Sequence, residues 1–277
     1  MFQGQKRTWV KELAQVVELL AANGYDRYVD LFGGSGFCSR LIKDVSPGAT
    51  VVYNDFDNYS ERLKHVEETN IILQFLRDIT KDVERNKPLP DEMHYPIMKY
   101  LYEAERKFGY VDTITISGNL LFSGRFVRSL KEIDRENFWC KAVKENYDAE
   151  ACHAYLEGLN VISVDAFRLL PLITPGTVCI VDPPYMGTDC KRYSGNIGLS
   201  KHLELIFKLI KSECLVIYFT SDKSELFMVF ETMNKALFDG CFDYKIFSHK
   251  VGITYNAQYV DYMIVFGAGK LLKKIKL

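Results

Sequence analysis

The chain has 277 residues, 48% of them hydrophobic and 26% charged, with a formal net charge of -1. These values exclude an intrinsically disordered chain and predict one large globular domain, or a domain that carries a sizeable insertion. No apolar run reaches the length of a membrane-spanning helix and no apolar stretch marks a secretory signal, so we expect a cytoplasmic protein without a membrane partner.

The first 56 residues predict one βαβ unit. Apolar side chains at positions 10, 13, 16, 17 and 20 recur with a helical period, which predicts a helix over 10–22 that ends at Asn23-Gly24. We expect a buried strand over 27–32, a glycine turn, a helix over about 36–45 and a strand over 50–55. Such a unit is typical of an α/β sheet with helices on both faces.

Residues 57–158 show a different pattern. Long charged stretches at 61–79 and 92–108 predict helices, and the segment 111–126 interrupts them. A crossover between parallel strands needs only about a dozen residues, so a span of this length predicts an inserted helical subdomain. We therefore expect one domain made of 1–56 and 159–277, with 57–158 inserted into it.

The alternation of strands and helices resumes after the insertion. We expect strands over 160–167, 177–185 and 214–221, and helices over 199–211 and about 223–236. Two final strands, 243–251 and 260–267, are joined by a short connection suited to an antiparallel hairpin. The fold class is therefore α/β, a mostly parallel sheet with a C-terminal antiparallel edge hairpin.

The segment DLFGGSGF, at 30–37, lies at a predicted turn from strand to helix. Its glycines allow a tight turn and let a ligand approach the backbone, and the following helix offers free N–H groups at its N-terminus. The spacing departs from Gly-x-Gly-x-x-Gly and no P-loop motif occurs, which favours an adenosine-containing ligand smaller than a dinucleotide. A purely structural turn is the alternative.

Three further carboxylates follow predicted strands, namely Asp55, Asp165 and Asp182. Each alone is also typical of a helix cap. Because the carboxyl ends of strands in an open sheet border one crevice, we expect these side chains, Asp30 and the glycine turn to line a single pocket. Asp55 is placed for ribose hydroxyls, and Asp165 with Phe167 for an adenine.

The residues Asp182-Pro183-Pro184-Tyr185 directly follow the apolar residues 177–181. Prolines end strands because they lack a backbone donor, so a plain strand end is the alternative. The four-residue string should occur by chance in about one in a thousand chains of this length. The rarity of this string favours a functional role for these four residues over a plain strand end.

The order of DLFGGSG, ND, VDAF and DPPY, with a long insertion between the second and third, resembles the Dam-type DNA adenine-N6 methyltransferases of the alpha group. The resemblance extends over nearly the whole chain. It implies a Rossmann-like class I methyltransferase sheet with S-adenosyl-L-methionine as the cofactor. It also implies methyl transfer to the N6 of an adenine flipped out of double-stranded DNA, in a restriction-modification, phage or regulatory setting.

The resemblance also assigns cofactor residues. RTWVKEL, at 7–13, looks like a degenerate form of the family's Lys-Trp-Ala-Gly-Gly-Lys segment, in which the glycine pair is missing and Leu13 replaces the second lysine. It implies that Trp9 and Lys11 hold the methionine end of the cofactor, and core packing is the alternative for Trp9. The further cofactor residues are Asp30, Phe32, Gly33, Gly34, Gly36, Asp55, Asp165, Ala166, Phe167 and Asp182.

The proposed chemistry explains the DPPY segment. An adenine amino group is a poor nucleophile because its lone pair is delocalised into the ring. We expect the Asp182 carboxylate and a backbone carbonyl beside Pro183 to accept its two hydrogens, and Tyr185 to stack on the base. The catalytic residues are thus Asp182, Pro183, Pro184 and Tyr185, which align nitrogen, methyl carbon and sulfur without a metal.

In the insertion, SGNLLFSGRFVRS at 117–129 loosely resembles the family's DNA-contacting segment. The resemblance implies DNA contacts by Asn119, Phe122, Arg125 and Arg128, with the arginines on phosphates or a guanine edge. Residues 61–150 hold 15 Lys and Arg against 17 Asp and Glu, so DNA binding needs a local basic patch.

Two other functions stay open. The DPPY motif also suits methylation of another amino or amide nitrogen, such as cytosine N4, an RNA base or a glutamine side chain. The altered N-terminal segment fits a non-catalytic DNA-binding relative. Seven cysteines without CxxC spacing predict reduced thiols rather than a metal site, and the sequence leaves a monomer and a weak dimer open.

Overall fold

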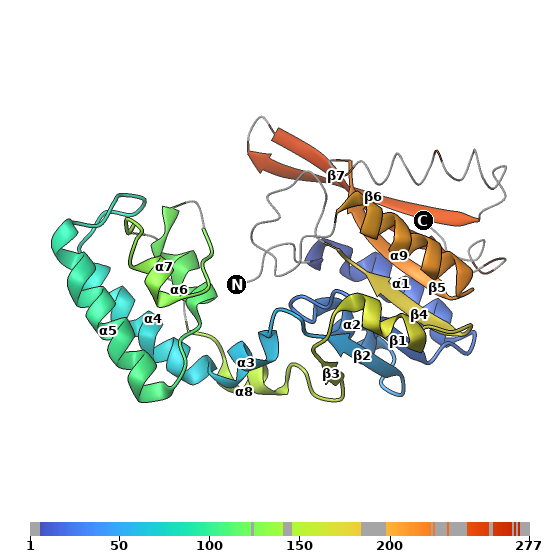
Figure 1. The fold of residues 1–277 in the computed structure, drawn as a ribbon, viewed down its shortest axis with the longest axis horizontal. Coiled ribbons are helices and arrows are strands. Elements are labelled where there is room, and N and C mark those ends of the chain that lie inside the picture. Colours follow the sequence, from blue (N-terminus) through green and yellow to red (C-terminus); the bar gives the residue numbers. More distant parts are fainter. Residues whose placement is uncertain are drawn as a thin grey trace. The chain divides into compact units, whose positions relative to one another are not determined.

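The chain divides into two compact units (Figure 1). The sheet unit comprises Phe2–Tyr59 and Gly158–Leu277, and the insertion unit comprises Ser60–Glu157. The computed structural model describes residues 6–122, 125–140, 146–183, 198–222, 224, 232, 243–254, 257–267, 269 and 271. The insertion unit is therefore one continuous stretch of sequence between the two parts of the sheet unit.

The sheet unit contains a 7-stranded sheet in the order β3-β2-β1-β4-β5-β7-β6. Neighbours pair in parallel from β3 to β5, whereas β7 is antiparallel to both β5 and β6. The strands are β1 (Arg27–Asp30), β2 (Thr50–Asn54), β3 (Asn160–Ile162), β4 (Thr177–Val181), β5 (Leu215–Ser221), β6 (Tyr244–Thr254) and β7 (Ala257–Phe266). This topology confirms the predicted Rossmann-like methyltransferase sheet with its C-terminal antiparallel hairpin.

Two predicted strands end earlier in the structure than the sequence suggested. The strand predicted over 160–167 ends at Ile162, because Asp165 caps the short 3-10 helix η4 (Ala166–Leu172). The strand predicted over 177–185 ends at Val181, directly before Asp182 and Pro183. In both places the polar residue lies just beyond the strand, where its side chain is not committed to a sheet face.

Apolar side chains cover both faces of the sheet. Alternate residues of β4 point to opposite faces, so Ile180 joins one core cluster and Val181 the other. The first cluster packs under η1 (Arg7–Trp9), α1 (Val10–Ala21) and α2 (Phe37–Val45), and the second under η4 and α9 (Leu199–Lys211). The helix predicted over about 223–236 falls almost entirely outside the described residues.

The insertion unit is helical, as predicted. Its helices are α3 (Tyr59–Lys64), which begins at the unit boundary, α4 (Val66–Thr80), η2 (Asp91–Met93), α5 (His94–Phe108), α6 (Thr113–Leu120), α7 (Leu130–Ile133) and α8 (Ala149–Ala154). The segment 111–126 was expected to interrupt the helices, yet it contains α6. The reason is the N-cap, since the Asp112 side chain accepts a hydrogen bond from the Thr115 backbone N–H.

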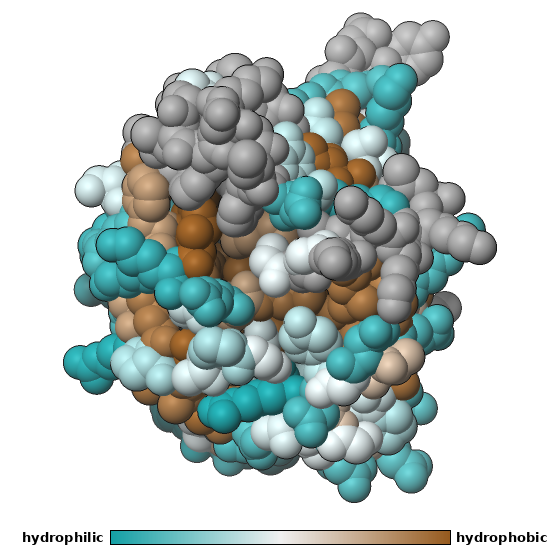
Figure 2. Space-filling model, turned by 90° about the vertical axis from the view of Figure 1, so that its right-hand side faces the viewer, coloured by the Kyte–Doolittle hydropathy of each residue, from teal (hydrophilic) through white to brown (hydrophobic). Residues whose placement is uncertain are grey.

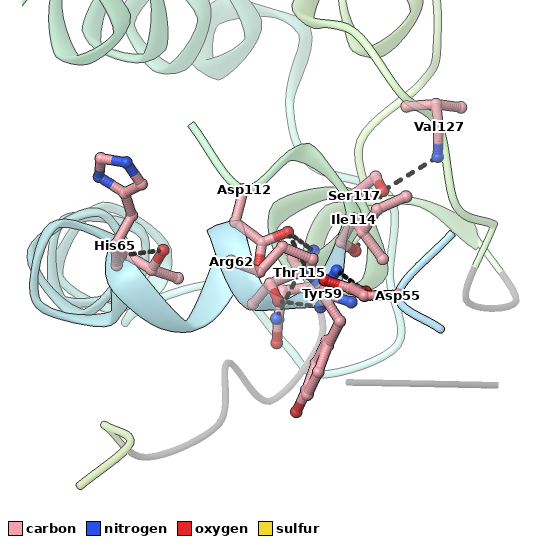
Figure 3. Close-up of polar contacts among 11 residues, drawn as sticks. Asp55, Tyr59, Arg62, His65, Asp112, Ile114, Thr115, Ser117 and Val127 are labelled. Atoms are coloured by element: carbon pink, nitrogen blue, oxygen red, sulfur yellow. Dashed lines mark hydrogen bonds and ion pairs between the residues drawn. The ribbon is translucent and has the colours of Figure 1, made fainter. Parts of the chain in front are cut away.

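A buried ion pair joins α3 to the start of α6 (Figure 3). Arg62 Nε lies 3.0 Å from Asp112 Oδ1, and another guanidinium nitrogen donates to Thr115 Oγ1 at 3.0 Å. The side chains of Arg62 and Asp112 are 7% and 5% exposed, so removing either partner leaves a buried charge. This polar contact links the two helices in the interior of the insertion unit.

The surface mixes hydrophilic and apolar residues. Figure 2 shows brown apolar side chains in the middle of one face, between teal hydrophilic ones. Exposed large apolar side chains include Phe56 at 46% in the sheet unit and Phe122 at 61% in the insertion unit. Among the described residues, none of the helices is both long and apolar enough to cross a membrane.

Candidate active site at the carboxyl ends of the strands

The order of the strands reverses between β1 and β4, which are parallel neighbours. In open α/β sheets this reversal opens a crevice at the carboxyl ends of the strands. β1 ends at Asp30, which pairs in register with Ile180, and β4 leads into Asp182. The structure therefore places these two carboxylates at the same edge of the sheet, as the sequence predicted.

The glycine turn after β1 is shaped by the neighbouring strand β2. An added Cβ at Gly33 would overlap the ring of Tyr53 and lie 2.9 Å from the Asn54 carbonyl oxygen. The Tyr53 hydroxyl shares its proton between the Gly34 carbonyl at 2.8 Å and Asp55 Oδ1 at 3.1 Å. Gly34 and Gly36 have φ of 50° and 69°, which disfavours side chains there. The turn thus needs its glycines for close packing as well as for conformation.

Asn54 links three strand ends through its side-chain amide. Its Nδ2 donates to the Leu31 carbonyl and to the Val164 carbonyl, both at 2.9 Å, and its Oδ1 accepts from Val164 N at 3.0 Å. Asn54 is 1% exposed, so these bonds are made in the interior. The amide holds the glycine turn and the loop after β3 at fixed positions relative to each other.

The end of β2 carries a buried carboxylate and an exposed ring. Asp55 is 1% exposed, and its Oδ1 accepts from the Tyr59 backbone N–H at 2.6 Å (Figure 3). This is the helix-cap arrangement that was the alternative to ribose binding. Phe56, which follows it, is 46% exposed and therefore presents an aromatic face that the sequence analysis did not assign.

The loop after β3 brings the other predicted adenine-binding residues to the same edge. Asp165 is exposed, and its Oδ1 accepts from the Phe167 backbone N–H at 2.9 Å, whereas Ala166 is only 8% exposed. The ring of Phe167 is half-buried, with Lys208 Nζ 5.6 Å from its centroid. β2 and β3 are parallel neighbours, so this loop and the end of β2 lie at the same edge.

Asp182 lies beside a buried lysine. Lys6 Nζ is 2.8 Å from Asp182 Oδ1, and the two side chains are 7% and 21% exposed. Burial raises the pKa of the Asp182 carboxyl to about 6, although the Lys6 ammonium group opposes the shift. Asp182 is thus a carboxylate that titrates close to neutral pH and remains partly accessible.

Comparison with known proteins decides the family. A protein of Haemophilus influenzae described as "Putative methyltransferase" is 32% identical over 273 residues, which cover 95% of this chain and 90% of that protein. The chain belongs to this methyltransferase family. No family model matches the chain. Among solved structures, the precorrin-6y C5,15-methyltransferase of Geobacter metallireducens matches with a TM-score of 0.36 and 11% sequence identity. The match covers 96% of this chain and 93% of that one. A likeness this remote says nothing about the substrate.

Trp9 of the methyltransferase has the packing environment that was the alternative to cofactor binding. It is fully buried in the core, 6.1 Å from the Phe219 ring and 4.3 Å from the His249 ring. Its indole Nε1 donates to Asp261 Oδ2 at 3.1 Å. Lys11, by contrast, is exposed on α1. The Trp9 ring is therefore part of the core and is not on the accessible surface beside Asp182.

The predicted DNA-contacting residues of the methyltransferase lie in the insertion unit. Asn119 is 2% exposed inside α6, where its Nδ2 donates to the Thr115 carbonyl at 2.8 Å, so we leave it out of the contacts proposed below. Phe122 is 61% exposed and packs against Trp139 with centroids 4.6 Å apart. Arg128 is exposed, and Arg125, 57% exposed, lies 2.8 Å from Glu136 Oε2.

Sequence reasoning missed four residues of this site, and only two of them carry a local signal. Asn54 and Phe56 flank the predicted Asp55, so the whole segment after β2 deserved assignment. Lys6 and Asp261 have no such signal, because each reaches the site from a distant part of the sequence. Of the predicted catalytic residues, Pro184 and Tyr185 lie outside the described residues, as do Cys190 and Cys241 among the cysteines.

Asp30 makes the stability of the methyltransferase depend on pH. Burial raises the pKa of its carboxyl from 3.8 to about 7, against the hydrogen bond from Ser39 Oγ at 2.7 Å. The folded state keeps this proton when the unfolded state has lost it, so its stabilising contribution is complete below about pH 4 and is lost as the pH rises through about 7. We expect Asp30→Asn, which retains an acceptor for Ser39, to remove this loss.

The measurement is the free energy of unfolding in urea at pH 5 and pH 8. The decrease between these pH values should be smaller in Asp30→Asn than in the unmodified protein, by up to about 3 kcal/mol. Asp26→Asn, at an exposed position before β1, is the matched control and should change nothing. An equal decrease in Asp30→Asn and the unmodified protein would show that Asp30 titrates normally.

Proposed function

We propose that this methyltransferase transfers the methyl group of S-adenosyl-L-methionine to the exocyclic N6 of an adenine in double-stranded DNA. The observation that carries the proposal is Asp182, a carboxylate 21% exposed directly after β4 and beside the strand that leads into the glycine turn. A partly accessible carboxylate in a DPPY sequence supports chemistry at a polar N–H group better than it supports a plain strand end.

The backbone around the glycine turn fits the cofactor. Gly33 and Gly34 are half-buried rather than covered, and α2 begins at Phe37 with its first N–H groups available at this edge. Phe56 and Phe167, at the ends of neighbouring strands, offer aromatic surface for an adenine ring. The cofactor would supply a methyl group on a sulfonium ion, and the chain would supply its binding and alignment.

The two carboxylates that we expect to bind the adenosine half of the cofactor differ in their exposure to solvent. Asp165 is exposed, whereas Asp55 is 1% exposed and already accepts from Tyr59 N. Asp165 is therefore the more accessible acceptor for a ligand hydroxyl or amino group, and Asp55 would take the ribose only by sharing its oxygens with the helix it caps.

Polar groups near Asp182 are available for the substrate. Within the described part of the chain, the hydroxyl groups of Tyr218, Thr220 and Ser221 are buried without a hydrogen-bond partner. Tyr218 pairs in register with Val181, next to Asp182. Buried hydroxyls of this kind cost free energy unless a ligand or water satisfies them, which favours a polar molecule at this edge.

Asp182 would act on the amino group directly. Its carboxylate accepts one amino hydrogen, which directs the nitrogen lone pair towards the methyl carbon. The cofactor would supply the methyl group and keep its sulfur as a neutral thioether, and the nitrogen, once methylated, would release one proton to water. The role of the protein is to hold the nitrogen, the methyl carbon and the sulfur in line and to keep the Asp182 carboxylate ionised.

DNA is the proposed partner of the insertion unit. Phe122, Arg125 and Arg128 are exposed there and close together in sequence, and an aromatic ring and guanidinium groups suit stacking on bases and contact with phosphates. The excess of acidic residues over 61–150 means that such contacts would depend on this local group.

The test is mass analysis of nucleosides after incubation with S-adenosyl-L-methionine and DNA amplified in vitro, which carries no methyl groups. We expect N6-methyladenine with the unmodified protein and none with Asp182→Ala. A methylated cytosine with unmodified adenine would overturn the adenine proposal. Parallel incubations with RNA and with protein extract identify the other nitrogen acceptors.

Calorimetry with S-adenosyl-L-methionine separates an enzyme from a non-catalytic DNA-binding relative. We expect saturable binding to the purified protein, with an affinity that falls in variants of the glycine turn. Absence of binding at millimolar cofactor would overturn the catalytic proposal as a whole.

A further inference from the structure

We propose that Lys6 is a positioning residue for Asp182: its ammonium group fixes the orientation of this carboxylate and keeps it ionised at neutral pH. The part of the inference that concerns catalysis rests on the proposed function. The part that concerns the ionisation of Asp182 is a property of the protein alone. Lys6 lies outside the segment 7–13 that carried the sequence resemblance.

The contacts of Lys6 are those of an interior charge. Its Nζ lies 2.8 Å from Asp182 Oδ1 and 5.4 Å from the centroid of the Phe219 ring on β5. The residue is 6% exposed, so water screens the pair only weakly. A lysine buried against an aromatic face with a carboxylate at hydrogen-bond distance has one preferred position for its charge. That position is at the end of β4.

Trp9 holds the turn that carries Lys6. The Trp9 backbone N–H donates to the Lys6 carbonyl at 2.9 Å, and its indole Nε1 donates to Asp261 Oδ2 at 3.1 Å. Its ring lies between those of Phe219 and His249. The N-terminal turn is therefore anchored to the sheet by the Trp9 indole, through its hydrogen bond to Asp261 and its ring contacts. In this account Trp9 acts on the site through Lys6 rather than through contact with a ligand.

The groups around Asp182 explain why a cation is needed there. Asp30 on β1 and Asp261 on β7 are buried carboxyls, at 1% and 6% exposed, that interact electrostatically with Asp182. Two neutral groups, Tyr218 on β5 and Cys38 on α2, also face this charge, and the pKa of each is raised partly by Asp182. Like charges and burial both favour protonation of Asp182, and Lys6 opposes them.

The proposed reaction needs a hydrogen-bond acceptor for the amino group at Asp182. A protonated Asp182 would offer a hydroxyl where the amino hydrogen needs a lone pair. With Lys6 on Oδ1, the second carboxylate oxygen, Oδ2, is presented to the substrate in a fixed direction. Lys6 thus contributes both the charge state and the orientation of the acceptor, without contact with the reacting nitrogen.

The test compares Lys6→Met with Arg7→Met, which removes one positive charge from an exposed position in the same turn. Carbon-13 NMR titration of the aspartate carboxyls, with the Asp182 signal assigned from the spectrum of Asp182→Asn, gives the Asp182 pKa in each protein. We expect it to rise by about one unit or more in Lys6→Met and to stay unchanged in Arg7→Met. An unchanged Asp182 titration in Lys6→Met overturns the proposal.

Two further variants separate charge from structure. Lys6→Gln keeps a hydrogen-bond donor without a charge and should raise the Asp182 pKa as Lys6→Met does, so it serves if Lys6→Met does not fold. Lys6→Arg keeps the charge and should restore the titration. An effect of Lys6→Arg as large as that of Lys6→Gln would mean that packing, not charge, controls Asp182.

The rate of methyl transfer gives the catalytic readout. Transfer should rise with pH through the Asp182 pKa, and in Lys6→Gln this rise should move to higher pH, with a rate near pH 7 lower by about twofold for a one-unit shift. A shifted NMR titration without a shift of the rate profile would overturn the catalytic part. If the unmodified protein methylates no nitrogen acceptor while the NMR shift is found, the proposed function fails and the role of Lys6 in ionisation stands.

Discussion

We expect Asp182→Ala to lower the rate of methyl transfer by about a thousandfold or more and to leave binding of S-adenosyl-L-methionine measurable. The reason is that in the proposed reaction the carboxylate interacts with the amino hydrogen during transfer, whereas we propose that the glycine turn and the aromatic residues at β2 and β3 hold the cofactor. Single-turnover transfer to DNA and calorimetry with the cofactor measure the two quantities separately on the same protein sample.

The stability of this variant needs its own control. Removing Asp182 leaves the ammonium of Lys6, 7% exposed, without its carboxylate, which costs about 2–3 kcal/mol. The double variant Lys6→Met with Asp182→Ala removes both charges and should recover most of this loss while remaining inactive. An active Asp182→Ala protein, or one that loses cofactor binding while folded, would contradict the assigned role.

Gly33→Ala is expected to weaken cofactor binding by about tenfold or more and to lower the free energy of unfolding by about 2–4 kcal/mol. The new Cβ would overlap the Tyr53 ring, which is fully buried and cannot move without breaking its hydroxyl contacts to Gly34 and Asp55. Urea unfolding and calorimetry with the cofactor measure the two effects.

Gly48→Ala provides the matched comparison. This glycine lies in the exposed turn before β2, and an added Cβ there meets no atom within 4 Å. Its free energy of unfolding should stay within about 0.5 kcal/mol of that of the unmodified protein. If the two glycine variants behave alike, close packing against Tyr53 is not what selects glycine at position 33.

Local sequence patterns predicted the elements of the sheet unit well. The apolar runs at β1, β4 and β5 are buried throughout or nearly so, which makes them readable without knowledge of their partners. The helix predicted over 199–211 is α9 with the same bounds. Two of the errors fall where a side chain caps a helix, at Asp112 and Asp165, because one local hydrogen bond there decides between helix and strand or loop.

The candidate site was less predictable because its contacts join distant parts of the chain. Trp9 and Asp261 are 252 positions apart, and neither lies in a pattern that indicates the other. Burial is equally invisible, since Asp55 at 1% and Asp165, which is exposed, both follow strands and look alike in sequence. The predicted strand ends indicated the edge of the sheet at which the carboxylates lie. Only the fold shows which of these carboxylates are accessible to solvent.

The amide of Asn54 also sets an order on biosynthesis. Its partners, Leu31 and Val164, lie 23 and 110 positions away, so the second is synthesised only after the whole insertion unit, Ser60–Glu157. Until Val164 emerges from the ribosome, the Asn54 amide cannot form its two hydrogen bonds to the Val164 backbone. The hydrogen bonds that hold the glycine turn against the loop after β3 can therefore be completed only after the insertion unit has been synthesised.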